Sequence, residues 1–155
     1  MIRRVLPLAA LLPILTAAAD TPAIQPGGWD VKSTAVDLTV PGAPGFLLRM
    51  MRGKSKTEHK CLAPQAAAQG IAALLVPDPK ARCTVESTKI ADGRFAQVIG
   101  CPQKDGRVMR LVRSGTYDAT GFTARATMSG QTPKGPLNIV LDQTARRAGP
   151  ACRKA

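Results

Sequence analysis

The chain has 155 residues, 45% hydrophobic residues and a formal net charge of +12. This length suits one domain with or without a targeting segment, and the hydrophobic fraction excludes wholesale disorder. The chain contains three Phe, one Trp, one Tyr and a single histidine, His59, which excludes a large aromatic platform for bases or sugars and any site that needs two imidazoles.

The N-terminus has the three parts of a secretory signal peptide. Two arginines precede an apolar run over residues 5–15, and small residues occupy the −3 and −1 positions if cleavage follows Ala19. A membrane anchor is the alternative, but residues 5–19 fall short of the roughly 20 residues that span a bilayer, and two prolines interrupt them. We therefore predict a signal peptide over residues 1–19, a periplasmic location, and a single mature domain over residues 20–155.

Export decides how the cysteines are interpreted. An even number of cysteines in an oxidising compartment predicts two disulfides. A zinc site is the alternative, but the sequence has no C-x2-C pair and only one histidine as an imidazole ligand. The four cysteines are Cys61, Cys83, Cys101 and Cys152.

The first half of the mature domain predicts two strands and a helix. A strand over residues 29–40 changes the parity of its apolar side chains between Val31 and Val36, which indicates a bulge near its middle. Residues 46–52 fit either a helical turn or a loop packed on the core, and residues 54–61 suit a strand with one solvated face. A helix over residues 63–75 has a proline at its first position and an alanine-rich apolar stripe that would pack on a sheet.

The second half predicts a meander of strands. Asp92-Gly93 is a strong hairpin signal between residues 83–90 and 94–101. Apolar and polar side chains then alternate in three further segments, as an antiparallel sheet with one solvated face requires. Those segments are residues 107–116, 122–129 and 136–145. The expected fold class is mainly β: about seven antiparallel strands in a curved sheet or partly open barrel, with one packed α-helix and two disulfides.

The hairpin register suggests a disulfide pairing. A three-residue turn from Ala91 to Gly93 would place Cys83 directly opposite Cys101, within the range that a disulfide tolerates. Cys61 would then pair with Cys152. Four cysteines allow three connectivities, so peptide mapping must decide between them.

An ordered set of short motifs runs through the mature chain. They are Gly28-Trp29-Asp30, Pro41-Gly42, Cys61-Leu62-Ala63-Pro64-Gln65, the Asp92-Gly93 turn, Tyr117 with Gly121, and Arg147 to Cys152. In this order, and with the four cysteines, they resemble the exported bacterial family of domain of unknown function 3617 (DUF3617). The resemblance covers essentially the whole mature chain. It implies export and a β-rich fold, and it supplies no activity and no catalytic residues.

Three positions depart from the family pattern. Gly28 stands where leucine is usual, Asp30 where glutamate is usual, and Ala63 where the family has a threonine that caps the helix. The loss of such a cap costs a helix about 1 kcal/mol.

No enzyme constellation is visible in the sequence. His59 would need a partner such as Ser55 or a nearby aspartate, but no nucleophile-elbow motif and no dense pair of carboxylates accompanies it. Neither of the common glycine-rich phosphate-binding motifs occurs. We therefore predict no catalytic residue, no metal ligand and no cofactor.

Positive charge is the remaining signal. The basic residues gather in three clusters: Arg49, Arg52, Lys54 and Lys56; Arg107, Arg110 and Arg113; and Arg146, Arg147, Arg153 and Lys154. The second cluster lies on one predicted strand, and we expect it to bind an anionic surface. If so, serine at all three of its positions should lower binding to anionic vesicles and leave the melting temperature nearly unchanged.

Two functions from different classes follow. The first is a non-enzymatic exported domain that binds an envelope partner or an anionic surface through its basic strands. The alternative explanation of the positive charge is a solvated surface that only keeps the protein soluble. Nucleic acid fits poorly, because the protein is exported and lacks the aromatic residues that grip single strands. The second function is a carrier of a small apolar ligand inside a curved β-sheet. Steep salt dependence of binding would favour the first, since salt screens charge contacts but not apolar burial.

Overall fold

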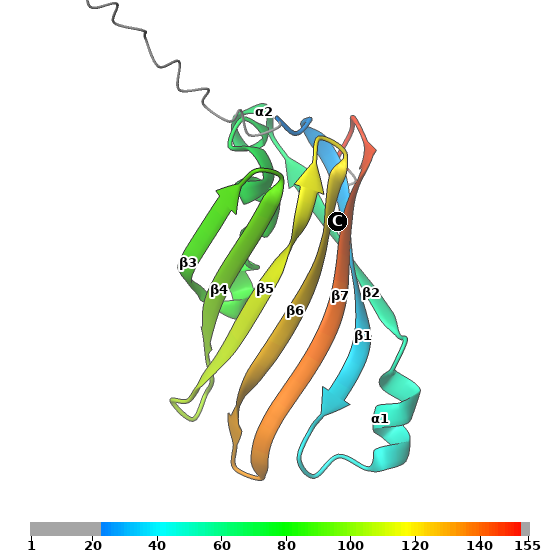
Figure 1. Ribbon diagram of the computed structural model, residues 1–155, viewed down its shortest axis with the longest axis vertical. Coiled ribbons are helices and arrows are strands. Elements are labelled where there is room, and N and C mark those ends of the chain that lie inside the picture. Colours follow the sequence, from blue (N-terminus) through cyan, green and yellow to red (C-terminus); the bar gives the residue numbers. More distant parts are fainter. Residues whose placement is uncertain (1–22, 153–155) are drawn as a thin grey trace, which may run out of the picture.

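The computed structural model describes residues 23–152, so the predicted signal peptide lies outside the described residues. Within that range the chain forms one seven-stranded antiparallel sheet in the order β2-β1-β7-β6-β5-β4-β3 (Figure 1). The strands are β1 (Gly27–Thr39), β2 (Ser55–Leu62), β3 (Thr84–Ala91), β4 (Arg94–Pro102), β5 (Val108–Asp118), β6 (Gly121–Thr132) and β7 (Gly135–Gly149). The predicted mainly-β fold is confirmed, and the sheet is open, with β2 and β3 as its two edges.

Strands β3 to β7 form a continuous meander, and β7 then pairs with β1. Two connections contain helices. The α-helix α1 (Gly45–Met51) joins β1 to β2, and the segment from β2 to β3 contains α2 (Pro64–Ala67) with two 3-10 helices, η1 (Gly70–Leu75) and η2 (Pro79–Ala81). Because β2 and β3 are opposite edges, this second connection must pass across the sheet. We call the face that it covers the inner face and the opposite face the outer face.

The core lies between the inner face and the crossing segment. Apolar side chains of η1 pack on those of β1, β4 and β6, with Phe95 and Phe122 in an edge-to-face contact at a centroid distance of 5.4 Å. Such aromatic pairs add specific geometry to a large buried apolar area. The largest fully buried side chains are Trp29, Phe122, Ile71, Leu74, Leu75 and Ile99.

The predicted helix over residues 63–75 is wrong in its continuity. Ala63 provides no side-chain cap, and α2 ends after one turn at Ala67. Gly70 then adopts a φ of +64°, a left-handed conformation that interrupts an α-helix and that glycine adopts without steric cost. The chain continues as η1, so the apolar stripe still reaches the core, in two short helices instead of one.

The predicted bulge in the first strand is confirmed, and the hairpin turn is corrected. The register of β1 against β7 shifts between Ala35 and Asp37. In the β3–β4 hairpin, Ala91 pairs directly with Arg94, so the turn has two residues and not three. Both turn residues have positive φ values, 51° at Asp92 and 70° at Gly93, as a type I′ turn requires.

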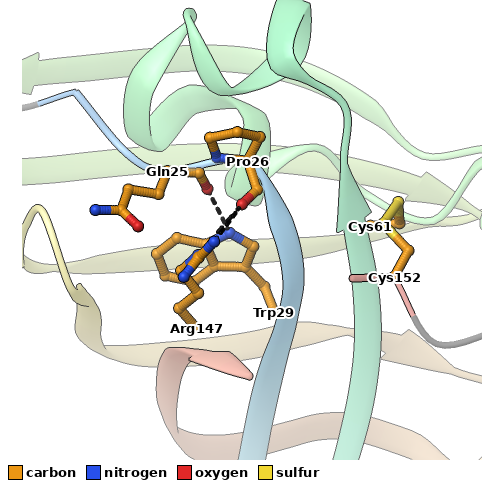
Figure 2. The surroundings of a disulfide bond; sticks show 6 residues. All are labelled: Gln25, Pro26, Trp29, Cys61, Arg147 and Cys152. Atoms are coloured by element: carbon orange, nitrogen blue, oxygen red, sulfur yellow. Dashed lines mark hydrogen bonds between the residues drawn. A yellow bond between two sulfur atoms is a disulfide. The ribbon is translucent and has the colours of Figure 1, made fainter. Parts of the chain in front are cut away.

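The disulfides nevertheless follow the predicted pairing. A bulge between Val85 and Ser87 shifts the β3–β4 register by one residue, which brings Cys83 opposite Cys101. We call this bond, with a sequence separation of 18 residues, the short disulfide. Cys61 and Cys152 form the long disulfide, with a separation of 91 residues (Figure 2).

The long disulfide lies where both ends of the domain meet. An added Cβ at Gly27 would lie 2.3 Å from the Gly149 carbonyl oxygen, so the C-terminal segment passes directly over the start of β1. Beside it, the indole Nε1 of Trp29 donates to the Gln25 carbonyl at 3.0 Å, and Arg147 Nη2 donates to the Pro26 carbonyl at 2.9 Å (Figure 2). These bonds hold the segment before β1 against the sheet.

Candidate functional site

The three arginines of the predicted basic strand do not form one surface. Arg113 lies on the inner face and is 7% exposed, whereas Arg110 lies on the outer face, where it pairs with Glu86 at 3.0 Å. Arg107 precedes β5 and pairs with Asp105 at 3.3 Å. Successive residues of a strand point to opposite faces, so residues 110 and 113 cannot face the same way. The structure therefore does not bring the three arginines together, and burial removes Arg113 from the set that was expected to bind an anionic surface.

Arg113 instead organises a buried polar network. Its Nε donates to Gln97 Oε1 at 2.8 Å, and its Nη2 donates to the carbonyl oxygen of Leu75 at the end of η1. Gln97 in turn donates through Nε2 to Thr88 Oγ1 at 3.0 Å. Burial lowers the pKa of Arg113 to about 10, against a weaker opposing effect of Glu58. This arginine ties the crossing segment to β4 and β5.

Lys60, on the edge strand β2, binds the same end of η1. Its Nζ on β2 donates to the carbonyl oxygens of Leu74 at 3.2 Å and Val76 at 2.7 Å. Cations are favoured at a helix C-terminus, where carbonyl groups lack intrahelical partners. Burial lowers the pKa of Lys60 below 10.5, and the charge of Glu58 opposes that shift. Lys60 and Arg113 thus have a structural role in holding η1.

His59 lies exposed on the outer face, in contact with Asp30. Its Nδ1 is 2.6 Å from Asp30 Oδ1, directly across the β1–β2 pair. Ser55 is four residues away on the same strand, and its hydroxyl is 2.8 Å from Thr34 Oγ1. Four residues along a strand correspond to about 13 Å, so the serine does not reach the imidazole. Within residues 23–152 no three His, Cys, Asp or Glu side chains are grouped so that they could hold a metal ion.

The outer face is polar, and two of its arginines are paired with acidic neighbours. Arg125 pairs with Asp142 at 3.0 Å, in addition to the Arg110–Glu86 pair. A hollow of about 680 Å³ lies over β3, β4 and β5 on this face. Charged, polar and apolar residues together form its walls: Lys89, Ala91, Asp92, Arg94, Phe95, Ala96, Ser114, Gly115 and Thr116.

The inner face has an apolar strip at the end away from α2. Met109 packs there over Gly130, where an added Cβ would lie 2.2 Å from the Met109 sulfur. The neighbouring apolar side chains are only partly covered, because the crossing segment packs at the other end of the sheet. They are Leu111, Met128, Leu137, Ile139 and Leu141.

Exposed positive charge concentrates around α1, at the end of the sheet opposite α2 (Figure 1). Between residues 37 and 56 the chain contains a single acidic residue, Asp37, which pairs with Arg52 at 2.7 Å. Lys134, in the β6–β7 turn, lies against the segment that leads into α1, since an added Cβ at Gly42 would be 2.6 Å from its Cδ. We call the five exposed cations here the basic end: Arg49, Arg52, Lys54, Lys56 and Lys134.

The sequence contains signals for the burial of Arg113 and for the helix α1. Arg113 shares its parity with Met109 and Leu111, which are apolar and lie on the inner face, so the alternation of the strand predicts that Arg113 points to that face as well. Residues 46–52 were compatible with a helical turn, and the structure forms α1 there without burying any of its residues. The alternative that the sequence left open, a loop packed on the core, does not form.

Comparison with known proteins gives the family and nothing finer. None of the helices in the described part of the chain has the length and hydropathy of a transmembrane span. Searches of curated proteins and of solved structures found no match. A family model described as "Protein of unknown function (DUF3617)" matches residues 24–152. The match covers most of the chain, and the protein therefore belongs to the DUF3617 family.

Proposed function

We propose that this protein is an exported, non-enzymatic domain that binds an anionic component of the cell envelope through the basic end. The observation that supports this most is the charge distribution: five exposed cations face one carboxylate around α1. On the outer face, by contrast, Arg110 and Arg125 are each paired with an acidic neighbour. A cluster of one sign attracts oppositely charged partners over about a Debye length and concentrates them at that surface.

The test compares two triple variants with the same change of charge. In the first, serine replaces Lys54, Lys56 and Lys134 at the basic end. In the second, serine replaces three exposed cations of the sheet, Lys32, Lys89 and Arg94. Binding to vesicles of phosphatidylglycerol in phosphatidylcholine is measured by cosedimentation at low and physiological salt.

We expect the first variant to lose about 3 kcal/mol of binding free energy at low salt, because a cation near an anionic surface contributes about 1 kcal/mol. That loss corresponds to roughly a hundredfold weaker binding. The second variant should bind nearly as well as the parent chain. Equal losses for the two variants would show that only net charge matters and would contradict a defined binding surface.

The carrier function is the second candidate, and the half-buried apolar strip on the inner face favours it. An apolar ligand could cover Leu137, Ile139 and Leu141, which the crossing segment leaves partly exposed. Native mass spectrometry of the protein purified from the exported fraction tests this. A copurifying mass of lipid size would support the carrier, and its absence would count against it.

A further inference from the structure

The helix α1 is apolar and exposes most of its apolar surface. Phe46 and Met50 are each 62% exposed, Met51 is 47% exposed and Leu47 is 43% exposed. At 3.6 residues per turn these four side chains occupy one continuous arc of roughly 140° on the helix. Leu48 and Arg49 flank this arc, and Leu48 is half-buried. Four large apolar side chains on one exposed face are typical of an interaction site.

The position of this face is fixed by the sheet. The Gly53 amide donates to the Ala35 carbonyl at 2.7 Å, and the Ala35 amide donates to the Lys54 carbonyl at 2.9 Å. The Arg52–Asp37 ion pair lies beside these bonds. They attach the C-terminal side of α1 to β1, and α1 lies at one end of the domain (Figure 1).

The charge around this arc identifies its occupant. The basic end places five exposed cations in α1 and in the segments next to it, and Asp37, the single acidic residue between positions 37 and 56, is already paired with Arg52. Apolar side chains next to a cationic rim suit the boundary between headgroups and acyl chains of an anionic bilayer, where each part finds a complementary partner. With seven residues, α1 is about 10 Å long and lies in such a boundary without spanning it.

We propose that α1 inserts its apolar arc into the interfacial region of an anionic lipid bilayer while the basic end rests on the headgroups. This inference rests on the proposed function and names its ligand as lipid, as distinct from a soluble polyanion. It assigns insertion to Phe46, Leu47, Met50 and Met51, and attraction to the cations.

The fluorescence of a second tryptophan tests insertion. Trp29 is the single tryptophan of the chain and is fully buried, so Phe46→Trp adds one exposed reporter on α1. With vesicles that contain brominated phosphatidylglycerol, we expect a blue shift and quenching of this reporter. Val112→Trp provides the matched control, because Val112 is 45% exposed on the outer face of β5. Its fluorescence should change little on binding.

A second variant separates insertion from charge attraction. Serine at both Phe46 and Met50 should weaken vesicle binding by about tenfold or more, since the transfer of two apolar side chains out of water is lost. Binding to soluble polyphosphate should stay as in the parent chain, because the cations are unchanged.

The outcomes distinguish this inference from the proposed function. Vesicle binding without quenching of the Phe46→Trp reporter would overturn insertion and leave charge-driven binding intact. A parent chain that binds neither vesicles nor polyphosphate would contradict the proposed function itself. A blue shift without lipid that grows with protein concentration, together with dimers in sedimentation, would show that a second copy covers α1 and would also overturn insertion.

Discussion

Replacing Arg113 by methionine should destabilise the fold. From the sequence we expected Arg113 to bind an anionic surface, but the structure buries it. The side chain is 7% exposed and donates to Gln97 Oε1 and to the Leu75 carbonyl. Methionine fills a similar volume but leaves both acceptors buried without their donor. Each such loss costs about 1–3 kcal/mol. Removal of a desolvated charge, reflected in the lowered pKa of about 10, offsets part of that cost.

We therefore expect Arg113→Met to lower the free energy of unfolding by about 2–3 kcal/mol. Arg110→Met is the matched control on the same strand, where an exposed pair with Glu86 predicts a loss of at most about 1 kcal/mol. Addition of Gln97→Leu to Arg113→Met removes one orphaned acceptor and should show a coupling of about 1–2 kcal/mol between the two sites.

Urea unfolding with both disulfides intact, followed by the fluorescence of buried Trp29, provides these values. If Arg113→Met and Arg110→Met have equally small effects, the buried network contributes nothing to stability and the reasoning is refuted.

Three further predictions concern the frame of the fold. By the chain-entropy model, serine in place of both cysteines of the long disulfide should lower the free energy of unfolding by about 4–5 kcal/mol. Serine in place of both cysteines of the short disulfide should lower it by about 3 kcal/mol. Urea unfolding measures both values, and the opposite order would contradict the model. Gly115→Ala should lower the free energy of unfolding by several kcal/mol, because the added Cβ would lie 2.0 Å from the Thr123 carbonyl oxygen. Gly45→Ala meets nothing within 4 Å and should be neutral or slightly stabilising. Similar shifts of the melting temperature for both variants would refute the close approach at Gly115. Hydrogen bonds from the Thr120 hydroxyl and amide lower the pKa of Asp118, so the stabilisation they provide is present above pH 3.8 and is lost as the pH falls through the lowered value. Thr120→Val should raise that pKa toward 3.8 in an NMR titration, and an unchanged value would show that the hydroxyl is not involved.

The strands could be predicted because their signals are local. Alternation of apolar and polar residues placed most strands within two or three residues of the observed ends, and a change of parity indicated the bulge of β1. The bulge of β3 gave no such signal, because the strand's side chains are mostly exposed and do not alternate. The sequence therefore led to the correct cysteine pair through a wrong turn length.

The candidate site depended on where charges lie in three dimensions, which composition cannot show. A count of cations along β5 treated Arg113 as exposed, although its apolar neighbours on the same face indicated burial. Lys134 joins the basic end only because the β6–β7 turn ends beside Gly42, more than 90 residues away in sequence. That contact is a product of the strand order, which no local pattern encodes.

In the proposed function, an anionic ligand contacts the basic end and not the face of the sheet. Chemical-shift mapping of the ¹⁵N-labelled mature chain against phosphatidylglycerol nanodiscs locates the contact directly. We expect the largest changes at backbone amides of residues 45–56 and at Lys134, with the amides of α2 and η1 unchanged. Largest changes over β3, β4 and β5, around Lys89 and Arg94, would show that the ligand contacts the sheet face and would contradict binding at the basic end.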